Sequence, residues 1–247
     1  MSQTIVLITG TSRGLGKALV ERFLALPNHT IIAANRNPED AGSKSLADLP
    51  KGANSVLITT KYDAGVEQSA FDVVSELQEK HGIAYLDIVV PNAAIVKVYP
   101  LARDVKRADI IEHVEINVLS VVTLFQATRD LMQKSSRQPI FAPMGSGAGY
   151  IRHQPPVPNS AYGASKSMIF WYGVRINAEE EWLNTFVIDP SWAQTDMGND
   201  GARILGFEKA TFTVDEVMDG VFRVLRTATK EKYGGKAVLY TGEVQEW

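Results

Sequence analysis

Cysteine is absent from this chain of 247 residues. Its absence excludes a disulfide framework, a thiolate zinc site and a cysteine nucleophile. Histidine is scarce as well: the chain has four, and they show neither an HExxH pattern nor any other metal-ligand spacing. The sequence therefore predicts no metal site.

Long hydrophobic runs and a strong charge of either sign are also missing. The formal net charge is −3 with no basic run, which argues against a nucleic-acid partner. The longest apolar runs are strand-sized, far below the roughly 20 residues that a spanning helix needs. The amino terminus lacks the basic and apolar regions of a signal peptide. We therefore expect a cytoplasmic protein with no membrane partner.

Short apolar segments rich in β-branched residues alternate with longer segments of helical periodicity. Continuous apolar strands of this kind are typical of a parallel sheet that is covered on both faces. The alternation predicts an α/β protein: one doubly wound, Rossmann-type domain over residues 1–247, with a parallel sheet of about seven strands and helices on both faces. The stretch 38–50 is ambiguous between loop and weak helix. The predicted strands are 5–9, 31–34, 56–59, 86–90, 140–144, 186–189 and 238–240, and the predicted helices are 15–26, 66–81, 108–132, 161–179 and 214–229.

A glycine-rich turn follows the first predicted strand directly. Glycines let the backbone turn sharply and approach a pyrophosphate, while a helix beginning near Gly14 directs free N–H groups toward that anion. A plain turn is the alternative, but the position between strand and helix favours a nucleotide site. The expected contacts in this turn are Gly10, Ser12, Arg13, Gly14, Leu15 and Gly16.

The residues after the second predicted strand indicate which cofactor binds. An Asp or Glu there would accept a hydrogen bond from a ribose 2′-hydroxyl, but this chain has Asn35 and Arg36. Arg36 offers a planar cation to a 2′-phosphate, and Arg13 can reach the same side. The alternative is that both arginines are solvated surface charges. We expect NADPH, with Asp63 accepting a hydrogen bond from the adenine amino group.

Tyr162 and Lys166 are spaced by four residues on a predicted helix, so their side chains share a face. A nearby ammonium favours a phenolate and lowers the pKa of the tyrosine. Such a tyrosine can exchange a proton with the oxygen of a ketone or alcohol. The spacing is common by chance, so other residues must support it.

Two further polar residues are candidates for the same chemistry. Ser146 follows the fifth predicted strand, at the sheet edge where ligands bind, and its hydroxyl can polarise a substrate oxygen. The alternative is an ordinary loop serine. Asn117 lies among apolar positions of a predicted helix, where it is either a satisfied core group or a functional one.

Taken in order, these motifs resemble the short-chain dehydrogenase/reductase family over essentially the whole chain. Further segments that carry the resemblance are 92–94 and 189–190. The resemblance implies a Rossmann fold, NADPH or NADP⁺, a homodimer or homotetramer, and a catalytic tetrad. The residues carried over to that tetrad are Asn117, Ser146, Tyr162 and Lys166.

The resemblance also implies a role for each residue. Tyr162 is the proton donor, Lys166 binds the nicotinamide ribose and tunes Tyr162, Ser146 orients the substrate carbonyl, and Asn117 holds a water in a proton relay. Thr195 binds near the nicotinamide carboxamide. The remaining cofactor contacts carried over are Asn92, Ala93, Ala94, Pro190, Trp192 and Met197.

Within that family, the chain more closely resembles the fungal norsolorinic acid ketoreductase-like enzymes. This finer resemblance rests on segments 123–129, 194–198 and 201–203 and on the terminal Trp247. It implies NADPH-dependent reduction of a bulky aromatic ketone in secondary metabolism.

The chain departs from the family pattern at several positions. Pro91 and Ala94 replace Asn and Gly, and Gly145 replaces a frequent serine. Pro143 lies in a predicted strand, where its missing N–H costs a ladder bond and indicates an early strand end or a bulge. The loop between Ser146 and Tyr162 is longer than usual, and we expect it to rim the substrate pocket.

The segment 192–212 is expected to form an apolar cover over the substrate. Ser146, Tyr150, Tyr162 and Trp192 are the expected substrate contacts, although core packing is an equal alternative for Trp192. An apolar pocket suits a bulky ring ketone.

Other residues have structural expectations. Ile204 and Leu205 are expected in the core, and Trp171 and Tyr172 at a subunit interface. Two alternative functions stay open: a dehydrogenase or reductase of another substrate, and a non-enzymatic NADPH-binding protein.

Overall fold

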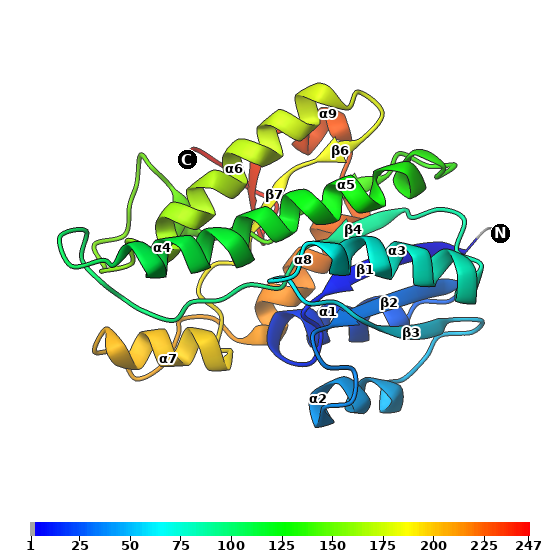
Figure 1. The fold of residues 1–247 in the computed structure, drawn as a ribbon, viewed down its shortest axis with the longest axis horizontal. Helices are drawn as coiled ribbons and strands as arrows, with labels where there is room; N and C mark the ends of the chain where they lie inside the picture. The colour runs from blue at the N-terminus through cyan, green and yellow to red at the C-terminus, as the bar shows by residue number, and fades with distance from the viewer. Residues whose placement is uncertain (1–2) are drawn as a thin grey trace.

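The structure, a computed structural model, describes residues 3–247 and shows a parallel β-sheet between two layers of helices (Figure 1). A six-stranded sheet has the order β3-β2-β1-β4-β5-β6, and a three-stranded sheet has the order β7-β8-β9. All neighbouring strands run parallel except β8 and β9. The predicted doubly wound α/β fold is confirmed. The strands are β1 (Thr4–Thr9), β2 (His29–Asn35), β3 (Val56–Lys61), β4 (Ile88–Val90), β5 (Ile140–Phe141), β6 (Asn184–Thr185), β7 (Val187–Asp189), β8 (Ala237–Leu239) and β9 (Val244–Gln245).

The two sheets continue one another across Pro143. Beyond the end of β5, Met144 bridges to Ile188 of β7 in the register that β5 and β6 already have. The N–H of Met144 faces the β4 side and that of Gly145 faces Ile188. Alternation along the strand thus directs the nitrogen of Pro143 toward the β6–β7 side, where proline has no N–H to donate. The early strand end expected at Pro143 is therefore observed, without a change of register.

The expected count of about seven parallel strands needs a small correction. The strand β9 is an additional, antiparallel edge strand that pairs with β8. It has only two residues, so it is too short to show a two-residue periodicity in the sequence.

The helices cover both faces of the sheet. Against one face, α1 and α8 pack on β1, β2 and β4 in one apolar core, while α3, α5 and α6 build a second core on the other face. In α8 the apolar residues recur at helical spacing, and Val217, Val221 and Val224 are all buried. The helices are α1 (Gly14–Leu24), α2 (Ala41–Lys44), α3 (Gln68–His81), α4 (Arg107–Val114), α5 (Ser120–Gln133), α6 (Tyr162–Glu179), α7 (Asp196–Ile204), α8 (Val214–Thr227) and α9 (Lys230–Tyr233).

The single helix predicted over 108–132 is interrupted in the structure. A five-residue π-helical segment, Glu115–Leu119, separates α4 from α5. Single π turns inside α-helices occur frequently at functional sites. The segment holds Asn117, which is buried.

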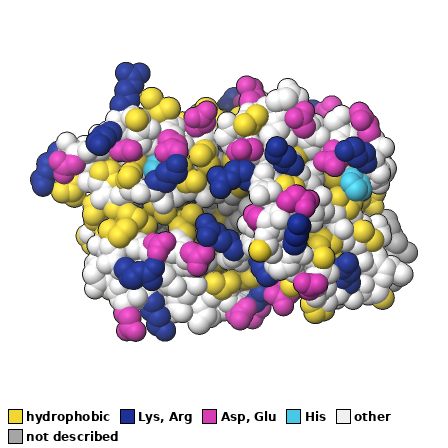
Figure 2. Space-filling model, turned by 60° about the horizontal axis from the view of Figure 1, so that its bottom comes forward, with side chains coloured by type: hydrophobic (Ala, Val, Ile, Leu, Met, Phe, Trp, Pro, Cys, Tyr) yellow, Lys and Arg dark blue, Asp and Glu magenta, His cyan; other side chains and the backbone are white. Residues whose placement is uncertain are grey.

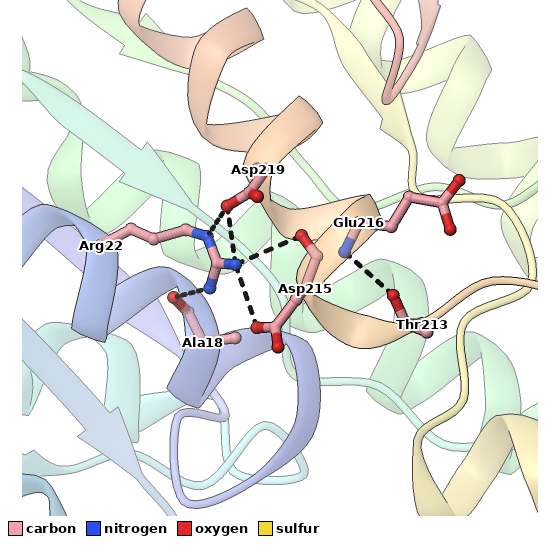
Figure 3. A network of polar contacts seen from close by, with 6 residues as sticks. All are labelled: Ala18, Arg22, Thr213, Asp215, Glu216 and Asp219. Carbon is pink, nitrogen blue, oxygen red and sulfur yellow. Dashed lines mark hydrogen bonds and ion pairs between the residues drawn. The ribbon is translucent and has the colours of Figure 1, made fainter.

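A polar network joins α1 to α8 (Figure 3). Arg22 donates to Asp219 Oδ1 at 2.8 Å and to both the side chain and the carbonyl of Asp215, at 3.1 and 3.2 Å. Its third nitrogen donates to Ala18 O at 3.0 Å. Thr213 Oγ1 caps α8 by accepting from Glu216 N at 3.1 Å. The network holds the start of α8 beside α1.

Candidate active site

A cleft of about 950 Å³ lies where the carboxyl ends of the central strands meet the glycine-rich turn. Figure 2 shows a hollow in the face turned forward, with apolar and basic side chains at its margin. Gly16, Asn117, Ser146, Tyr150 and Trp192 do not line it. The expected site residues that do are Gly10, Ser12, Arg13, Gly14, Leu15, Asn35, Arg36, Asp63, Asn92, Ala93, Ala94, Tyr162, Lys166, Pro190, Thr195 and Met197.

The glycine-rich turn forms a cradle for an anion. Gly10 and Gly14 have φ values of 68° and 55°, a region that glycine adopts without strain. A Cβ on Gly16 would collide with the carbonyl of Gly10 and lie 2.7 Å from Asn92 Nδ2. Gly16 therefore lets α1 pack close to the turn, and Asn92 braces the turn by donating to Gly10 O at 3.0 Å.

The amino end of α1 leaves backbone donors free for a ligand. Arg13 is the N-cap residue and makes no side-chain capping bond, so the first N–H groups of the helix are available to an anion. The Arg13 guanidinium pairs with Asp196 at 3.0 Å, and both side chains are exposed. Arg36 is exposed on the cleft wall and makes no ion pair with any residue of 3–247.

Two polar residues, Asn35 at the end of β2 and Asp63 just after β3, hydrogen-bond to neighbouring backbone groups. Asn35 Oδ1 accepts from Thr11 N at 2.6 Å, and its amide nitrogen is buried without a partner among the described residues. Asp63 Oδ1 accepts from Gly65 N at 3.0 Å. The cradle, the free helix donors, Arg36 and the volume of the cleft fit a dinucleotide with a 2′-phosphate.

Tyr162 and Lys166 lie in the first two turns of α6, on the wall of this cleft. Lys166 Nζ lies 5.7 Å from the centre of the Tyr162 ring and donates to Met144 O at 2.7 Å. Ser146 caps the short turn 147–149 by accepting from Ala148 N, and its hydroxyl acts to lower the pKa of Tyr162. The structure thus brings Ser146, Tyr162 and Lys166 together.

Burial dominates the electrostatics of this group. It raises the pKa of Tyr162 to about 12, opposed by the Ser146 side chain and helped by the charge of Asp189. Burial also lowers the pKa of Lys166 to about 8, against the influence of Asp189. The pKa of Tyr162 was expected to be lowered by Lys166, but it is raised, because loss of solvation is the largest influence on it.

Asn117 binds the segment that follows β4. Its Oδ1 accepts from Ile95 N at 2.8 Å, and its Nδ2 donates to Ile95 O and to Ser165 Oγ, both at 3.0 Å. One turn earlier, buried His113 accepts from Lys97 N at 3.2 Å. Both side chains hold the segment 95–97, whose first residue, Ile95, lines the cleft. Sequence reasoning had no signal for the part played by His113.

Comparison with known proteins agrees with this arrangement. The family model described as short chain dehydrogenase matches residues 4–201. This chain belongs to the short-chain dehydrogenase family. The norsolorinic acid ketoreductase of Dothistroma septosporum is 39% identical over 96% of this chain and 90% of its own length. The norsolorinic acid ketoreductase of Aspergillus parasiticus is 35% identical over 97% and 89%. The resemblance drawn from the sequence motifs is confirmed.

Solved structures show the same fold. The NADPH-bound carbonyl reductase from chicken fatty liver has a TM-score of 0.86 at 21% identity and covers 100% of both chains. A short-chain dehydrogenase/reductase from Burkholderia multivorans with bound NADP has a TM-score of 0.81 at 21% identity, with 99% and 100% covered.

Gly145 explains one departure from the short-chain dehydrogenase pattern. A Cβ at this position would lie 2.6 Å from Val187 Cγ1 and 3.2 Å from Phe170 Cζ. A serine side chain therefore has no room where β5 passes β7 and α6.

Tyr150 does not line the cleft of this short-chain dehydrogenase. Its hydroxyl donates to Asp189 Oδ2 at 2.8 Å, and its ring packs on Phe170 at a centroid distance of 5.2 Å. The Tyr150 hydroxyl is thus engaged by a buried carboxylate, and its expected contact with substrate stays a prediction. Sequence reasoning noted Asp189 only as part of a motif, although an acid ending an apolar strand was a usable signal.

The segment 192–212, which follows β7, forms a loop whose two ends are hydrogen-bonded to each other. Gln194 N donates to Phe212 O at 2.8 Å and Phe212 N donates to Trp192 O at 3.0 Å, so the stretch between them closes on itself. Trp192 donates to Gly198 O and packs edge-to-face on Phe207 at 5.5 Å. Trp192 is therefore a brace within this segment.

The prediction that Ile204 and Leu205 lie in the core is wrong. Ile204 is 62% exposed and Leu205 is only half-buried. Both residues end the short helix α7, which lies away from the sheet and its two apolar cores (Figure 1).

Two searches of the structure bear on other kinds of site. Among residues 3–247, no helix combines the length and apolar character needed to cross a bilayer. The same residues contain no cluster of three or more His, Asp or Glu that could hold a metal ion.

Proposed function

We propose that this short-chain dehydrogenase is an NADPH-dependent ketoreductase that reduces the carbonyl of a bulky aromatic, polyketide-like ketone to an alcohol. The observation that carries the proposal is the placement of Tyr162 and Lys166 on the same cleft wall as the glycine cradle. The identity with enzymes named norsolorinic acid ketoreductases supports the substrate class.

The cofactor would be held along the length of the cleft. Backbone donors of the glycine turn and of α1 receive the pyrophosphate, and Arg36 pairs with the 2′-phosphate. Asp63 accepts from the adenine amino group, Lys166 binds the nicotinamide ribose, and Thr195 faces the carboxamide. When bound, NADPH supplies the hydride for the carbonyl carbon.

The chain's own residues handle the substrate oxygen. The Ser146 hydroxyl donates to the carbonyl and polarises it. Tyr162 has a pKa of about 12, so it is protonated at neutral pH and gives its proton to the alkoxide that develops. The Lys166 ammonium and the Ser146 hydroxyl then stabilise the phenolate. A raised tyrosine pKa therefore suits the direction of reduction.

The role of Asn117 in this scheme is indirect. Its side-chain groups are bonded to Ile95 and Ser165. We assign it to hold the π-helical segment against the residues after β4. This placement keeps the backbone of the segment near Lys166, where it can support the water of a proton relay.

The substrate would bind under the segment 192–212. Apolar side chains on this segment are exposed, including Met197 at 38% and Phe207 at 54%. A flat aromatic ketone can bury such surface, with a gain of roughly 25 cal/mol per Å². A small polar substrate would gain little from it.

The protein is proposed to form a homodimer or homotetramer. Apolar side chains are exposed along α4–α5 and α6, which lie side by side (Figure 1). An exposed apolar face of this kind is typical of a subunit interface. The residues concerned are Ile111, Leu119, Met168, Trp171 and Val174.

The test is product analysis with purified protein. Hydroxyanthraquinone ketones, simpler aryl ketones and sugars are incubated separately with NADPH and with NADH, and the products are analysed by mass spectrometry. The proposal predicts a gain of two hydrogens on the aromatic ketones, with NADPH preferred. Turnover of sugars or small acids alone would point to another carbonyl substrate, and NADPH binding without turnover of any ketone would point to a binding protein.

A further inference from the structure

Asp189 is a buried carboxylate at the end of β7, next to the proposed catalytic group. It is 3% exposed. Its Oδ2 accepts from the Tyr150 hydroxyl at 2.8 Å, and its Oδ1 accepts from Ser191 N at 2.8 Å. Since burying an unpaired charge is costly, a carboxylate at this place calls for an explanation.

The partners of Asp189 belong to two segments that flank the reacting end of the cleft. The first is the turn 146–150, because Tyr150 donates to Asp189 and the backbone of Gly147 lowers the pKa of this carboxyl. A Cβ on Gly147 would lie only 3.2 Å from Asp189 Oδ2. The second is the loop after β7, where Ser191 has a φ of 58° that is unusual for a residue other than glycine. The carboxylate thus fastens the turn that carries Ser146 to the loop that follows Pro190.

Asp189 also acts on the two residues of α6 that carry the chemistry. Its negative charge favours the ammonium of Lys166 and disfavours the phenolate of Tyr162. Burial raises the pKa of Asp189, and its hydrogen-bond donors and the nearby Lys166 ammonium oppose that rise by favouring the carboxylate. The titratable groups that face the carboxylate are Tyr150 from the turn and Tyr162 and Lys166 from α6. Tyr240, the residue that follows β8, donates its backbone N–H to Asp189 O. No Lys, Arg, Asp or Glu side chain within 3–247 bonds to the carboxylate.

We propose that Asp189 is a positioning residue for the reduction. Held by Tyr150, it fixes the turn that presents Ser146 and supplies the buried negative charge that balances the ammonium of Lys166. The inference rests on the proposed reductase function and deepens it. It assigns Tyr150 to the support of the site rather than to the substrate.

The negative charge of Asp189 is expected to change how the rate of reduction depends on pH. Reduction requires a proton on Tyr162 and an ammonium at Lys166. Removing the charge of Asp189 lowers the pKa of both groups, so both lose their protons at lower pH. The alkaline limb of the pH profile of kcat/KM therefore moves toward lower pH.

The experiment compares Asp189→Asn and Tyr150→Phe with the wild-type protein. For Asp189→Asn we expect kcat to fall about tenfold to hundredfold and the alkaline limb to move down by roughly one pH unit. For Tyr150→Phe the charge remains, so we expect a lower kcat with an unmoved limb. The matched control is Tyr172→Phe, which alters a tyrosine of α6 that makes no side-chain hydrogen bond within the described chain, and which should match the wild type.

A second readout needs neither cofactor nor substrate. In protein labelled with ¹³C at the tyrosine ζ position, the Tyr162 resonance is assigned by its loss in Tyr162→Phe. In Asp189→Asn this resonance should begin to shift at lower pH than in the wild type. A folding defect alone would lower kcat at every pH and leave both the limb and the resonance in place.

The outcomes separate this inference from the proposed function. A wild-type protein that reduces no ketone overturns the function, while the Tyr162 resonance still tests Asp189. If Asp189→Asn leaves both the alkaline limb of the pH profile and the Tyr162 resonance unchanged, the inference is overturned and the proposed function stands. If Asp189→Asn does not fold, an unchanged kcat in Tyr150→Phe overturns it instead.

Discussion

The Lys166 ammonium donates a 2.7 Å hydrogen bond to the carbonyl of Met144, a residue that also bridges β5 to Ile188 of β7. This bond ties the first turns of α6 to the end of the central sheet. The position of Lys166 therefore depends on where β5 ends. Pro143, which removes one ladder donor just before Met144, lies at that same point.

Lys166→Arg is predicted to lose most of the activity although it keeps the positive charge. Lys166 is buried, and the planar fork of a guanidinium is larger than an ammonium and offers its donors in a fixed geometry. It cannot reproduce the single bond to Met144 without displacing Tyr162. Steady-state turnover should fall by roughly a hundredfold or more. Wild-type turnover in the variant would show that only the charge matters.

The rate of reduction is predicted to fall as pH rises above about 8. Burial lowers the pKa of Lys166 to about 8, so its ammonium is present below that pH and is lost above it. Tyr162, with a pKa of about 12, keeps its proton over the same range. The measurement is kcat/KM for the ketone between roughly pH 6 and 10. A profile that stays flat to the alkaline end would rule out a need for charged Lys166.

Arg36→Asp is predicted to change the cofactor preference. Arg36 is exposed on the cleft wall, and a charge-assisted bond to the 2′-phosphate contributes about 1.5–3 kcal/mol. The KM for NADPH should rise about tenfold to hundredfold, while the KM for NADH should fall and kcat should change little. The control is Arg223→Asp, at an exposed arginine of α8 outside the cleft. Equal effects of the two substitutions would mean that Arg36 is only a surface charge.

Asn117→Asp is predicted to destabilise the fold although the two side chains have nearly the same shape. The amide nitrogen of Asn117 donates to Ile95 O and Ser165 Oγ, and a carboxylate cannot donate. Leaving such a buried group unsatisfied costs about 1–3 kcal/mol. Urea unfolding of Asn117→Asp is compared with that of Asn37→Asp. Asn37 lies in an exposed loop, and its Oδ1 accepts from Glu39 N, a bond that an aspartate oxygen can keep. This control should stay within about 0.5 kcal/mol of the wild type. An equally small change at Asn117 would contradict its role in holding the segment after β4.

The sequence pattern was sufficient to predict the sheet and the glycine turn, because both depend on residues that are close together in the sequence. Apolar β-branched runs mark the buried strands, and Gly10 and Gly14 adopt the positive φ values that such a turn requires. The proposed tetrad was identified from the order and spacing of its residues. Ser146, Tyr162 and Lys166 do come together.

The features that were not predicted depend on tertiary contacts. The π turn around Asn117 leaves the apolar periodicity of the helix nearly unchanged, so the sequence shows one helix where the structure shows an interruption. The direction of the Tyr162 pKa shift depends on burial, which spacing cannot supply. Tyr150 and Asp189 are 39 positions apart, and nothing local indicates that they meet.

The central claim is that Tyr162 gives the proton in an NADPH-dependent reduction. It is tested most directly by following the loss of NADPH absorbance with a hydroxyanthraquinone ketone, in the wild type and in Tyr162→Phe, with NADPH affinity measured for both. The account predicts that the variant binds NADPH as the wild type does and turns over about 10²- to 10⁴-fold more slowly. Wild-type turnover in Tyr162→Phe would contradict it.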